Sequence, residues 1–173
     1  MTRSQAWCPA YIGIGSNLDD PPARVRRAFD ALRALPDCTA FAHSGLYRSA
    51  PMGPADQPDF INAVAACLTR LDARRLLHEL QAMEYAQDRQ RGAGHWGPRT
   101  LDLDLLVLGQ VVMNEPDLVV PHPRIHERNF VLLPLAEIAP YLIVPGHGSV
   151  NSMVTAIAGS ETRIARLEQG AQR

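Results

Sequence analysis

Residues 96–106 read Trp-Gly-Pro-Arg-Thr-Leu-Asp-Leu-Asp-Leu-Leu, and they lead into the clearest strand signal in the chain. Leucine and aspartate alternate through this stretch, and successive side chains of a strand point to opposite faces of its sheet. The pattern therefore predicts a strand over Leu101–Leu108 whose leucines face the core. Asp102 and Asp104 would then share the other face, roughly 7 Å apart along the strand.

Two carboxylates at that spacing suit hard cations that prefer oxygen ligands. They could hold two Mg²⁺ ions that clamp a polyphosphate. Arg89, Arg91 and Arg99 precede the pair, and guanidinium groups bind phosphate oxygens through two parallel hydrogen bonds. The same residues could also form a solvated strand face paired with arginines, so the spacing alone names no reaction.

The segments around this strand alternate between strand and helix patterns. Strands are expected at Ala10–Ile14, Thr39–Tyr47, Phe60–Leu68, Val111–Met113 (as a hairpin partner of Leu101–Leu108), Leu118–Pro121 and Arg163–Leu167. Helices are expected from Asp20 to Pro36, after Asp72, over Phe130–Ile138, and from Asn151 to about Gly159, with loops over Arg48–Asp59 and Gln87–Pro98. Strands joined without an intervening helix imply antiparallel pairing. The order predicts an α+β sandwich with a ferredoxin-like core.

The composition bounds the class of protein. The 173 residues are 46% hydrophobic, which suits a single globular domain over residues 1–173. A net charge of −1 gives no bulk attraction to nucleic acid or to a membrane surface. No run approaches the ~20 apolar residues that span a bilayer, and Met1–Pro9 lacks the apolar stretch of a signal peptide. We expect a cytoplasmic protein that acts as a monomer on small molecules.

Residue usage excludes several mechanisms. All 17 basic residues are arginine, which rules out a Schiff-base lysine and a lysine-containing phosphate loop. Cys8, Cys38 and Cys67 form no Cys-x-x-Cys pair, and we expect small buried thiols in a reducing compartment. His122 and His126 are four residues apart, but prolines flank His122 and no zinc-protease pattern follows. A single histidine that donates to a phosphate is the better interpretation.

Several separated motifs resemble, in the same order, the family of 2-amino-4-hydroxy-6-hydroxymethyl-dihydropteridine pyrophosphokinases. The resemblance runs from about Ala10 to about Pro145, and its most specific part is the stretch that ends in the two aspartates. The matching motifs are Gly15-Ser16-Asn17, Tyr47-Arg48-Ser49-Ala50-Pro51-Met52-Gly53-Pro54, Asp56-Gln57-Pro58-Asp59-Phe60-Ile61-Asn62, Gly97-Pro98-Arg99-Thr100-Leu101-Asp102-Leu103-Asp104, Val120-Pro121-His122-Pro123 and Arg128-Asn129-Phe130.

The resemblance implies a reaction and a fold. The family transfers pyrophosphate from ATP to the hydroxymethyl group of 6-hydroxymethyl-7,8-dihydropterin and releases AMP, in folate biosynthesis. Its fold is a three-layer α/β/α sandwich around an antiparallel sheet, with a ferredoxin-like core. Two Mg²⁺ ions would bridge the ATP phosphates, one between the α and β oxygens and one between the β and γ oxygens.

The resemblance also assigns roles by position. Asp102 and Asp104 would hold the metal ions, and together with Arg89 and Arg99 they would form the catalytic group. ATP would be bound by Gln81, Glu84, Arg89, Arg91, Trp96, Arg99, His122 and Arg128. The pterin would be bound by Ser49, Ala50, Met52, Phe60, Asn62 and Phe130, with the two phenylalanine rings on its faces and the amide at its hydrogen-bonding edge.

The chain departs from the family pattern at four positions. Phe60 stands where a tyrosine is common, which keeps the stacking surface and loses a hydroxyl. His95 stands where Arg or Lys is common, so its charge at neutral pH is an open point. Val119 and Pro123 stand where some members carry polar or aromatic contacts to ATP. These changes bear on the finer ATP contacts and leave the metal residues intact.

Two other classes of function share parts of this pattern. A nucleotidyltransferase also carries Gly-Ser and an Asp-x-Asp strand, but its Gly-Ser lies close before the aspartates, whereas Ser16 is far upstream. A non-catalytic ferredoxin-like binding domain would need no magnesium and would tolerate loss of Asp104. The identity of the group that accepts the hydroxyl proton stays open, between a metal-bound hydroxyl and an aspartate.

Overall fold

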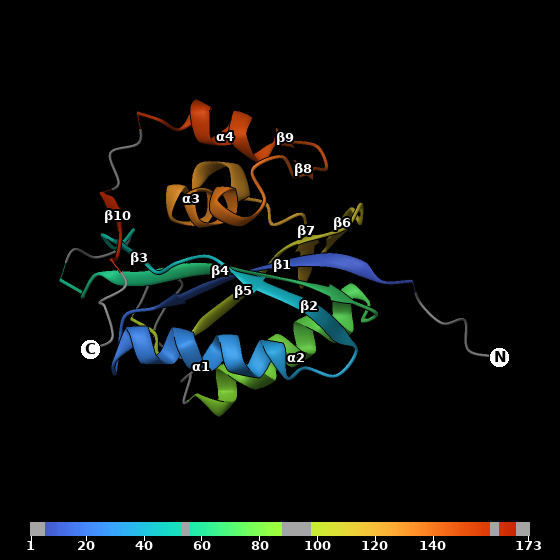
Figure 1. The fold of residues 1–173 in the computed structure, drawn as a ribbon, viewed down its shortest axis with the longest axis horizontal. Coiled ribbons are helices and arrows are strands. Elements are labelled where there is room, and N and C mark those ends of the chain that lie inside the picture. Colours follow the sequence, from blue (N-terminus) through green and yellow to red (C-terminus); the bar gives the residue numbers. More distant parts are fainter. Residues whose placement is uncertain (1–5, 53–55, 88–97, 160–162, 169–173) are drawn as a thin grey trace.

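A computed structural model describes residues 6–52, 56–87, 98–159 and 163–168. Six strands within these residues form an antiparallel sheet, in which β1 lies between β4 and the edge strand β5 (Figure 1). The sheet order is β10-β3-β4-β1-β5, and β2 pairs with another part of β4. These strands are β1 (Cys8–Ser16), β2 (Cys38–His43), β3 (Tyr47–Ser49), β4 (Phe60–Thr69), β5 (Asp102–Leu108) and β10 (Ile164–Arg166).

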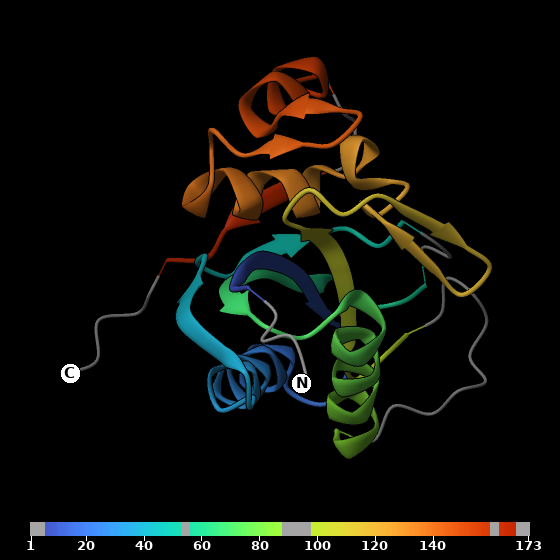
Figure 2. The ribbon, with the colours of Figure 1, turned by 90° about the vertical axis from the view of Figure 1, so that its right-hand side faces the viewer.

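Helices cover both faces of the sheet. Helices α1 (Pro21–Arg33) and α2 (Ala73–Ala86) lie side by side on one face, as Figure 2 shows with α1 in blue and α2 in green. Helix α3 (Asn129–Ile138) packs on the other face, and α4 (Val150–Ala156) packs on α3 (Figure 1). The remaining elements are the short helix η1 (Ile125–Glu127) and the two-stranded pairs β6 (Met113–Glu115) with β7 (Leu118–Val120), and β8 (Ile143–Val144) with β9 (Gly148–Ser149).

The helix starts follow from the sequence. Asp20 accepts a hydrogen bond from the backbone N–H of Ala23 at 3.3 Å, and Asp72 accepts one from Arg75 at 2.9 Å. Each carboxylate satisfies an N–H group that the first turn of a helix leaves without a partner. Helices α1 and α2 therefore begin where the sequence predicts, directly after Asp20 and Asp72.

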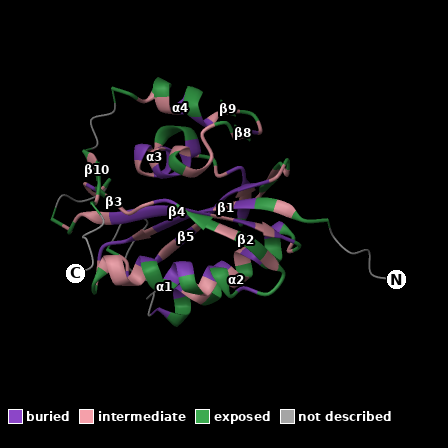
Figure 3. Ribbon diagram, in the orientation of Figure 1, coloured by how far each residue is buried: buried purple, intermediate pink, exposed green. Residues whose placement is uncertain are grey.

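Two apolar clusters hold the layers together. One lies between the sheet and helices α1 and α2, and includes Leu103 and Leu105 of β5. The other lies between the sheet and helices α3 and α4, and includes Leu106 and Val107. The buried strands in the centre and the exposed outer helix faces are seen in Figure 3. Because Leu103 and Leu105 face α1 and α2, alternation turns Asp102 and Asp104 to the opposite face.

The predicted strand over Thr39–Tyr47 is two strands, β2 and β3. Between them, the N–H of Ser44 donates to the carbonyl of Val64 at 2.9 Å, and the Ser44 hydroxyl accepts from the N–H of Val64 at 3.0 Å. A side-chain oxygen thus takes the place of a backbone acceptor and interrupts the ladder.

The predicted hairpin between Leu101–Leu108 and Val111–Met113 is wrong. Gly109 adopts a φ of +50° and its N–H donates to the carbonyl of Pro9 at 2.8 Å, which turns the chain away from β5. Strand β6 pairs with β7 instead, with Glu115 opposite Leu118. In the described residues, the structure has no helix long and apolar enough to cross a membrane.

Candidate active site

The end of β1 lies between the two strands that carry most of the predicted site. Gly15 is opposite Asn62 of β4 on one side and opposite Asp102 of β5 on the other. A Cβ atom on Gly15 would lie 3.5 Å from the Asn62 amide oxygen and 3.9 Å from the Phe60 ring. The glycine therefore leaves the space between the predicted pterin residues and the predicted metal residues free of a side chain.

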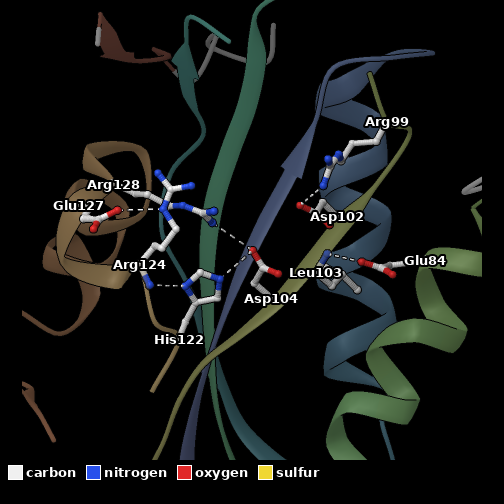
Figure 4. Close-up of polar contacts among 9 residues, drawn as sticks. All are labelled: Glu84, Arg99, Asp102, Leu103, Asp104, His122, Arg124, Glu127 and Arg128. Carbon is white, nitrogen blue, oxygen red and sulfur yellow. Dashed lines mark hydrogen bonds and ion pairs between the residues drawn. The ribbon is translucent and has the colours of Figure 1, made fainter. Parts of the chain in front are cut away.

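The two aspartates are surrounded by cationic and histidine groups (Figure 4). The Arg99 guanidinium donates to the Asp102 carboxylate at 2.7 Å. The Asp104 carboxylate lies 3.6 Å from the Arg128 guanidinium and 3.9 Å from His122 Nε2. Five residues that the sequence predicts for one site thus meet at the same edge of the sheet, although they come from three separate segments.

This arrangement shifts the titration of two groups. Burial, followed by repulsion from Asp102, raises the pKa of Asp104 to about 7. Burial, followed by the charge of Arg128, lowers the pKa of His122 to about 4, so the imidazole is neutral at physiological pH. The backbone N–H of Arg124 donates to His122 Nδ1 at 3.1 Å. The ring proton is therefore on Nε2, the nitrogen nearest Asp104.

Arg128 has a donor that the described residues do not satisfy. Its Nε atom is buried and has no hydrogen-bond partner among the residues that the structure describes. A buried donor without a partner costs roughly 1–3 kcal/mol, which a bound anion can relieve. The guanidinium carbon also lies 5.8 Å from the centre of the Phe130 ring, so the predicted ATP and pterin sides adjoin here.

Glu84 supports the strand that carries the aspartates. Strand β5 is at the edge of the sheet formed by the described residues, so within them the N–H groups on its outer side have no neighbouring strand. One Glu84 carboxylate oxygen accepts the N–H of Leu103, between the two aspartates, at 2.7 Å (Figure 4). Gln81 lies one turn earlier in α2 and is exposed.

The predicted pterin residues lie on β3, β4 and the start of α3. The Asn62 amide donates to the Ser49 hydroxyl at 2.8 Å, and both side chains are buried. The N–H of Ala50 donates to the carbonyl of Arg163 at 3.1 Å, while Met52 is exposed. The rings of Phe60 and Phe130 are half-buried, which leaves each one partly accessible to a ligand.

Three predicted ATP residues, Arg89, Arg91 and Trp96, lie outside the described residues.

The sequence reasoning missed two residues that shape the site. Arg124 holds His122 through its backbone N–H and pairs with Glu127 at 2.8 Å. Asn17, assigned only to a family motif, is buried beside Arg99. The available signal for Asn17 was its place as a polar residue directly after an apolar strand.

The carboxylate pair fits a cation that shares its ligands with a substrate. Among the described residues, no group of three or more His, Cys, Asp and Glu side chains could hold a metal ion without other ligands. Mg²⁺ is commonly bound by one or two carboxylates together with substrate phosphates and water. Desolvation and the neighbouring Asp102 charge raise the pKa of Asp104, and a bound cation would offset both effects.

Comparison with known proteins identifies similar sequences. The family described as 7,8-dihydro-6-hydroxymethylpterin-pyrophosphokinase (HPPK) matches residues 11–140. The 2-amino-4-hydroxy-6-hydroxymethyldihydropteridine pyrophosphokinase of Pseudomonas aeruginosa is 49% identical over 135 residues, which cover 78% of this chain and 83% of the relative. The enzyme of the same name from Haemophilus influenzae is 42% identical over 149 residues, covering 86% and 92%.

Solved structures share the fold. A Plasmodium falciparum HPPK-DHPS variant crystallised with pterin and p-hydroxybenzoate superposes with a TM-score of 0.70 at 11% sequence identity. The match covers 92% of this chain and 45% of that one, so the chain spans less than half of the Plasmodium protein. The wild-type Plasmodium protein gives the same TM-score of 0.70, with 46% of its chain covered.

Proposed function

This chain belongs to the 7,8-dihydro-6-hydroxymethylpterin-pyrophosphokinase family, and from this premise we propose how its residues carry out the reaction. It is a 2-amino-4-hydroxy-6-hydroxymethyldihydropteridine pyrophosphokinase of folate biosynthesis, which transfers pyrophosphate from ATP to the pterin hydroxymethyl group and releases AMP. The observation that carries the residue assignment is the meeting of Asp102, Asp104, Arg99, His122 and Arg128 at one edge of the sheet.

Asp102 and Asp104 are proposed to hold two Mg²⁺ ions. When bound, the ions neutralise phosphate oxygens and favour attack on the β-phosphorus. The support is the shared face of the two carboxylates, together with the pKa of Asp104, which burial and the Asp102 charge raise. Arg99 keeps the Asp102 carboxylate in place, and Glu84 fixes the backbone between the aspartates.

The ATP phosphates are proposed to lie against Arg128, His122 and Arg99. The buried Nε of Arg128 offers a donor that has no partner among the described residues. Neutral His122 offers its Nε2–H, because Nδ1 already accepts the Arg124 N–H. Arg89, Arg91, Trp96, Gln81 and Glu84 complete the proposed ATP contacts, as the family pattern implies.

The pterin is proposed to bind on the other side of Gly15. Its flat ring gains from apolar faces supplied by Phe60 and Phe130. Asn62 meets its polar edge, held by the Ser49 hydroxyl, with backbone groups near Ala50 and Met52. Because Gly15 has no side chain, the hydroxymethyl group can lie over it, close to the carboxylate pair. There the hydroxyl oxygen attacks the β-phosphorus, and AMP leaves.

Membership of the family also bears on the architecture, the oligomeric state and the location of the protein. We propose a three-layer α/β/α sandwich with a ferredoxin-like core, supported by the helices on both faces of the antiparallel sheet. One domain over residues 1–173 acts as a monomer on small-molecule substrates, in the cytoplasm where ATP is abundant. Binding to nucleic acid or to a membrane is not part of the proposal.

The test is to identify the nucleotide that forms from ATP, Mg²⁺ and 6-hydroxymethyl-7,8-dihydropterin. We expect AMP, and only when both the pterin and Mg²⁺ are present. Release of pyrophosphate would indicate a nucleotidyltransferase instead. Pterin binding without turnover by the folded protein would indicate a binding domain, and would overturn the proposal.

A further inference from the structure

Asn17 joins the two halves of the proposed site. It directly follows β1, and its side chain is only 2% exposed. Its amide oxygen accepts the backbone N–H of Arg99 at 2.9 Å, and its own backbone N–H donates to the Arg99 carbonyl at 3.1 Å. Its amide nitrogen donates to the Pro58 carbonyl at 3.1 Å and to the Gln57 side-chain oxygen at 3.2 Å.

The two segments that Asn17 bridges carry different substrate groups. Pro58 comes two residues before Phe60 and four before Asn62, which are proposed to bind the pterin. Arg99 donates to the Asp102 carboxylate at 2.7 Å, next to the proposed phosphate site. The bridge therefore runs from the acceptor side to the metal side through a single side chain.

The division of the hydrogen bonds is specific. Among the described residues, the amide oxygen accepts only from the Arg99 segment, and the amide nitrogen donates to the Gln57–Pro58 segment. Its neighbour Ser16 is also buried, but its hydroxyl donates to the Thr100 carbonyl at 2.6 Å, which is its one side-chain hydrogen bond within the described part of the chain. Anchoring of the metal-side segment to β1 therefore does not require an asparagine, whereas a link between both segments does.

We propose that Asn17 is a positioning residue that fixes the pterin segment relative to the carboxylate pair, so that the pterin hydroxyl is aligned with the β-phosphorus of ATP. The proposal rests on the placement of the two substrates given under the proposed function. Transfer between two bound substrates depends steeply on their alignment, and a displacement of about 1 Å can cost on the order of 100-fold in rate. Loss of the bridge should therefore slow chemistry between bound substrates more than it weakens their binding.

The substitution Asn17→Asp separates the two halves of the bridge. A carboxylate oxygen still accepts the Arg99 N–H. The second oxygen can no longer donate, and it faces the Pro58 carbonyl, which is itself only an acceptor. Gln57 can turn its amide to donate, but Pro58 cannot adapt. The change therefore releases the pterin segment and keeps the metal-side contact.

The measurement is the single-turnover rate of AMP formation with both substrates saturating, so that changes in affinity drop out. We expect Asn17→Asp to lower this rate by about 10- to 100-fold. The dissociation constants of a non-hydrolysable ATP analogue with Mg²⁺, and of the pterin, are measured by fluorescence. We expect the dissociation constant of the ATP analogue to change by less than about threefold, because the metal-side contact is retained.

Two further variants keep the test decisive. Ser16→Ala removes a buried hydrogen bond of the same strand end to the neighbouring residue Thr100, and should leave the saturated rate within about threefold of wild type. Gln57→Leu removes one acceptor at a half-buried position, so the fold is expected to tolerate it, and should lower the rate by a smaller factor than Asn17→Asp. Thermal unfolding checks that each variant is folded.

The outcomes distinguish this inference from the proposed function. If wild-type protein forms no AMP, the proposed function fails first. If wild type forms AMP but Asn17→Asp and Gln57→Leu both keep its saturated rate, or if Ser16→Ala slows the reaction as much as they do, the positioning role of Asn17 is overturned.

Discussion

Two polar clusters at opposite edges of the sheet differ in how their charged groups are satisfied. The carboxylate cluster consists of Asp102, Asp104, His122 and Arg128 at the β5 edge. There the pKa of Asp104 is raised to about 7, the pKa of His122 is lowered to about 4, and Arg128 Nε has no partner in the described part of the chain. Each of these groups would gain from a bound cation or anion.

The second cluster, the Glu137 cluster, lies where α3 meets β3 and β10. The Glu137 carboxylate accepts hydrogen bonds from the Tyr47 hydroxyl at 2.8 Å, the Gly45 N–H at 3.1 Å and the Arg166 guanidinium at 2.9 Å. Burial and the bond to Glu137 raise the pKa of Tyr47 to about 12, which keeps it a donor. The Glu137 carboxylate and its three donors therefore satisfy one another within the protein.

The comparison separates function from stability. Ionisable groups that are held together without mutual satisfaction cost folding free energy, and such costs are typical of sites completed by a ligand. Groups that satisfy one another stabilise the fold and need nothing further. Substitutions in the carboxylate cluster should therefore reduce activity without destabilising the protein, and substitutions in the Glu137 cluster should do the reverse.

The largest effect is expected for removal of an aspartate charge. Asp104→Asn should lower the rate of AMP formation by on the order of 10³-fold, because one of the two proposed Mg²⁺-binding carboxylates is gone. Without Mg²⁺ at pH 8, the same variant should be as thermally stable as wild type or more so, because the repulsion between the Asp104 and Asp102 charges is removed. Activity and thermal unfolding are measured on the same samples.

The truncating substitutions Asp102→Ala and Asp104→Ala should also abolish activity while the protein stays folded. Retained turnover in both would contradict the metal assignment. A large drop in the unfolding temperature of Asp104→Asn would instead show that the aspartate stabilises the fold, and the contrast between the two clusters would disappear.

A tenfold effect is expected at Glu84. Glu84→Ala removes the acceptor of the Leu103 N–H and lets the strand between the aspartates shift, so we expect about a tenfold loss of rate. Binding of an ATP analogue at saturating Mg²⁺ should change little if the carboxylate acts through the strand. A loss of analogue affinity as large as the loss of rate would favour the direct ATP contact that the family pattern implies.

Local patterns explain how much of this could be predicted from the sequence. The caps Asp20 and Asp72 and the Leu-Asp alternation of β5 depend on neighbouring residues alone. The bounds of α1 and β5 and the start of α2 were therefore predicted to within a few residues. The pairing of β10 with β3 joins residues more than a hundred positions apart. No local pattern encodes such a contact.

The site divides in the same way. The aspartate pair and Arg99 are adjacent in sequence and were recognised together, as was the family order of the motifs. The roles of Glu84 and Asn17 depend on hydrogen bonds to Leu103 and Arg99, and these form only once the sheet is assembled. The Glu137 cluster spans 90 residues between Tyr47 and Glu137 and left no signal in either segment.

A smaller effect, on stability alone, is expected at Tyr47. Tyr47→Phe removes a hydrogen bond to a carboxylate at a half-buried position and should destabilise the fold by about 1 kcal/mol. For a chain of this length that corresponds to a decrease of roughly 2–4 °C in the unfolding temperature. Activity should stay within about twofold of wild type. A loss of activity without a change in unfolding temperature would place Tyr47 in the reaction.

The smallest effect is the pH dependence of the Glu137 cluster. Burial raises the pKa of Glu137, but the hydrogen bonds from Arg166 and Tyr47 outweigh it and lower that pKa below its ordinary range. A carboxylate whose pKa is lower in the folded state stabilises the fold above its unfolded pKa of about 4.3. This contribution is lost as the pH falls through the folded value. Glu137→Gln keeps an acceptor oxygen and removes the charge, so it isolates the contribution of the charge.

Wild type should therefore unfold at a higher temperature than Glu137→Gln at pH 7, and the difference should shrink as the pH is lowered below about 4.3. Because the Arg166 partner is exposed, the difference is small at any pH and smaller still at high salt. Thermal unfolding of both proteins from pH 7 to pH 3.5 measures it. A difference that stays constant over that range would mean that the charge of Glu137 contributes nothing, and that the cluster is held by the shape of its hydrogen bonds alone.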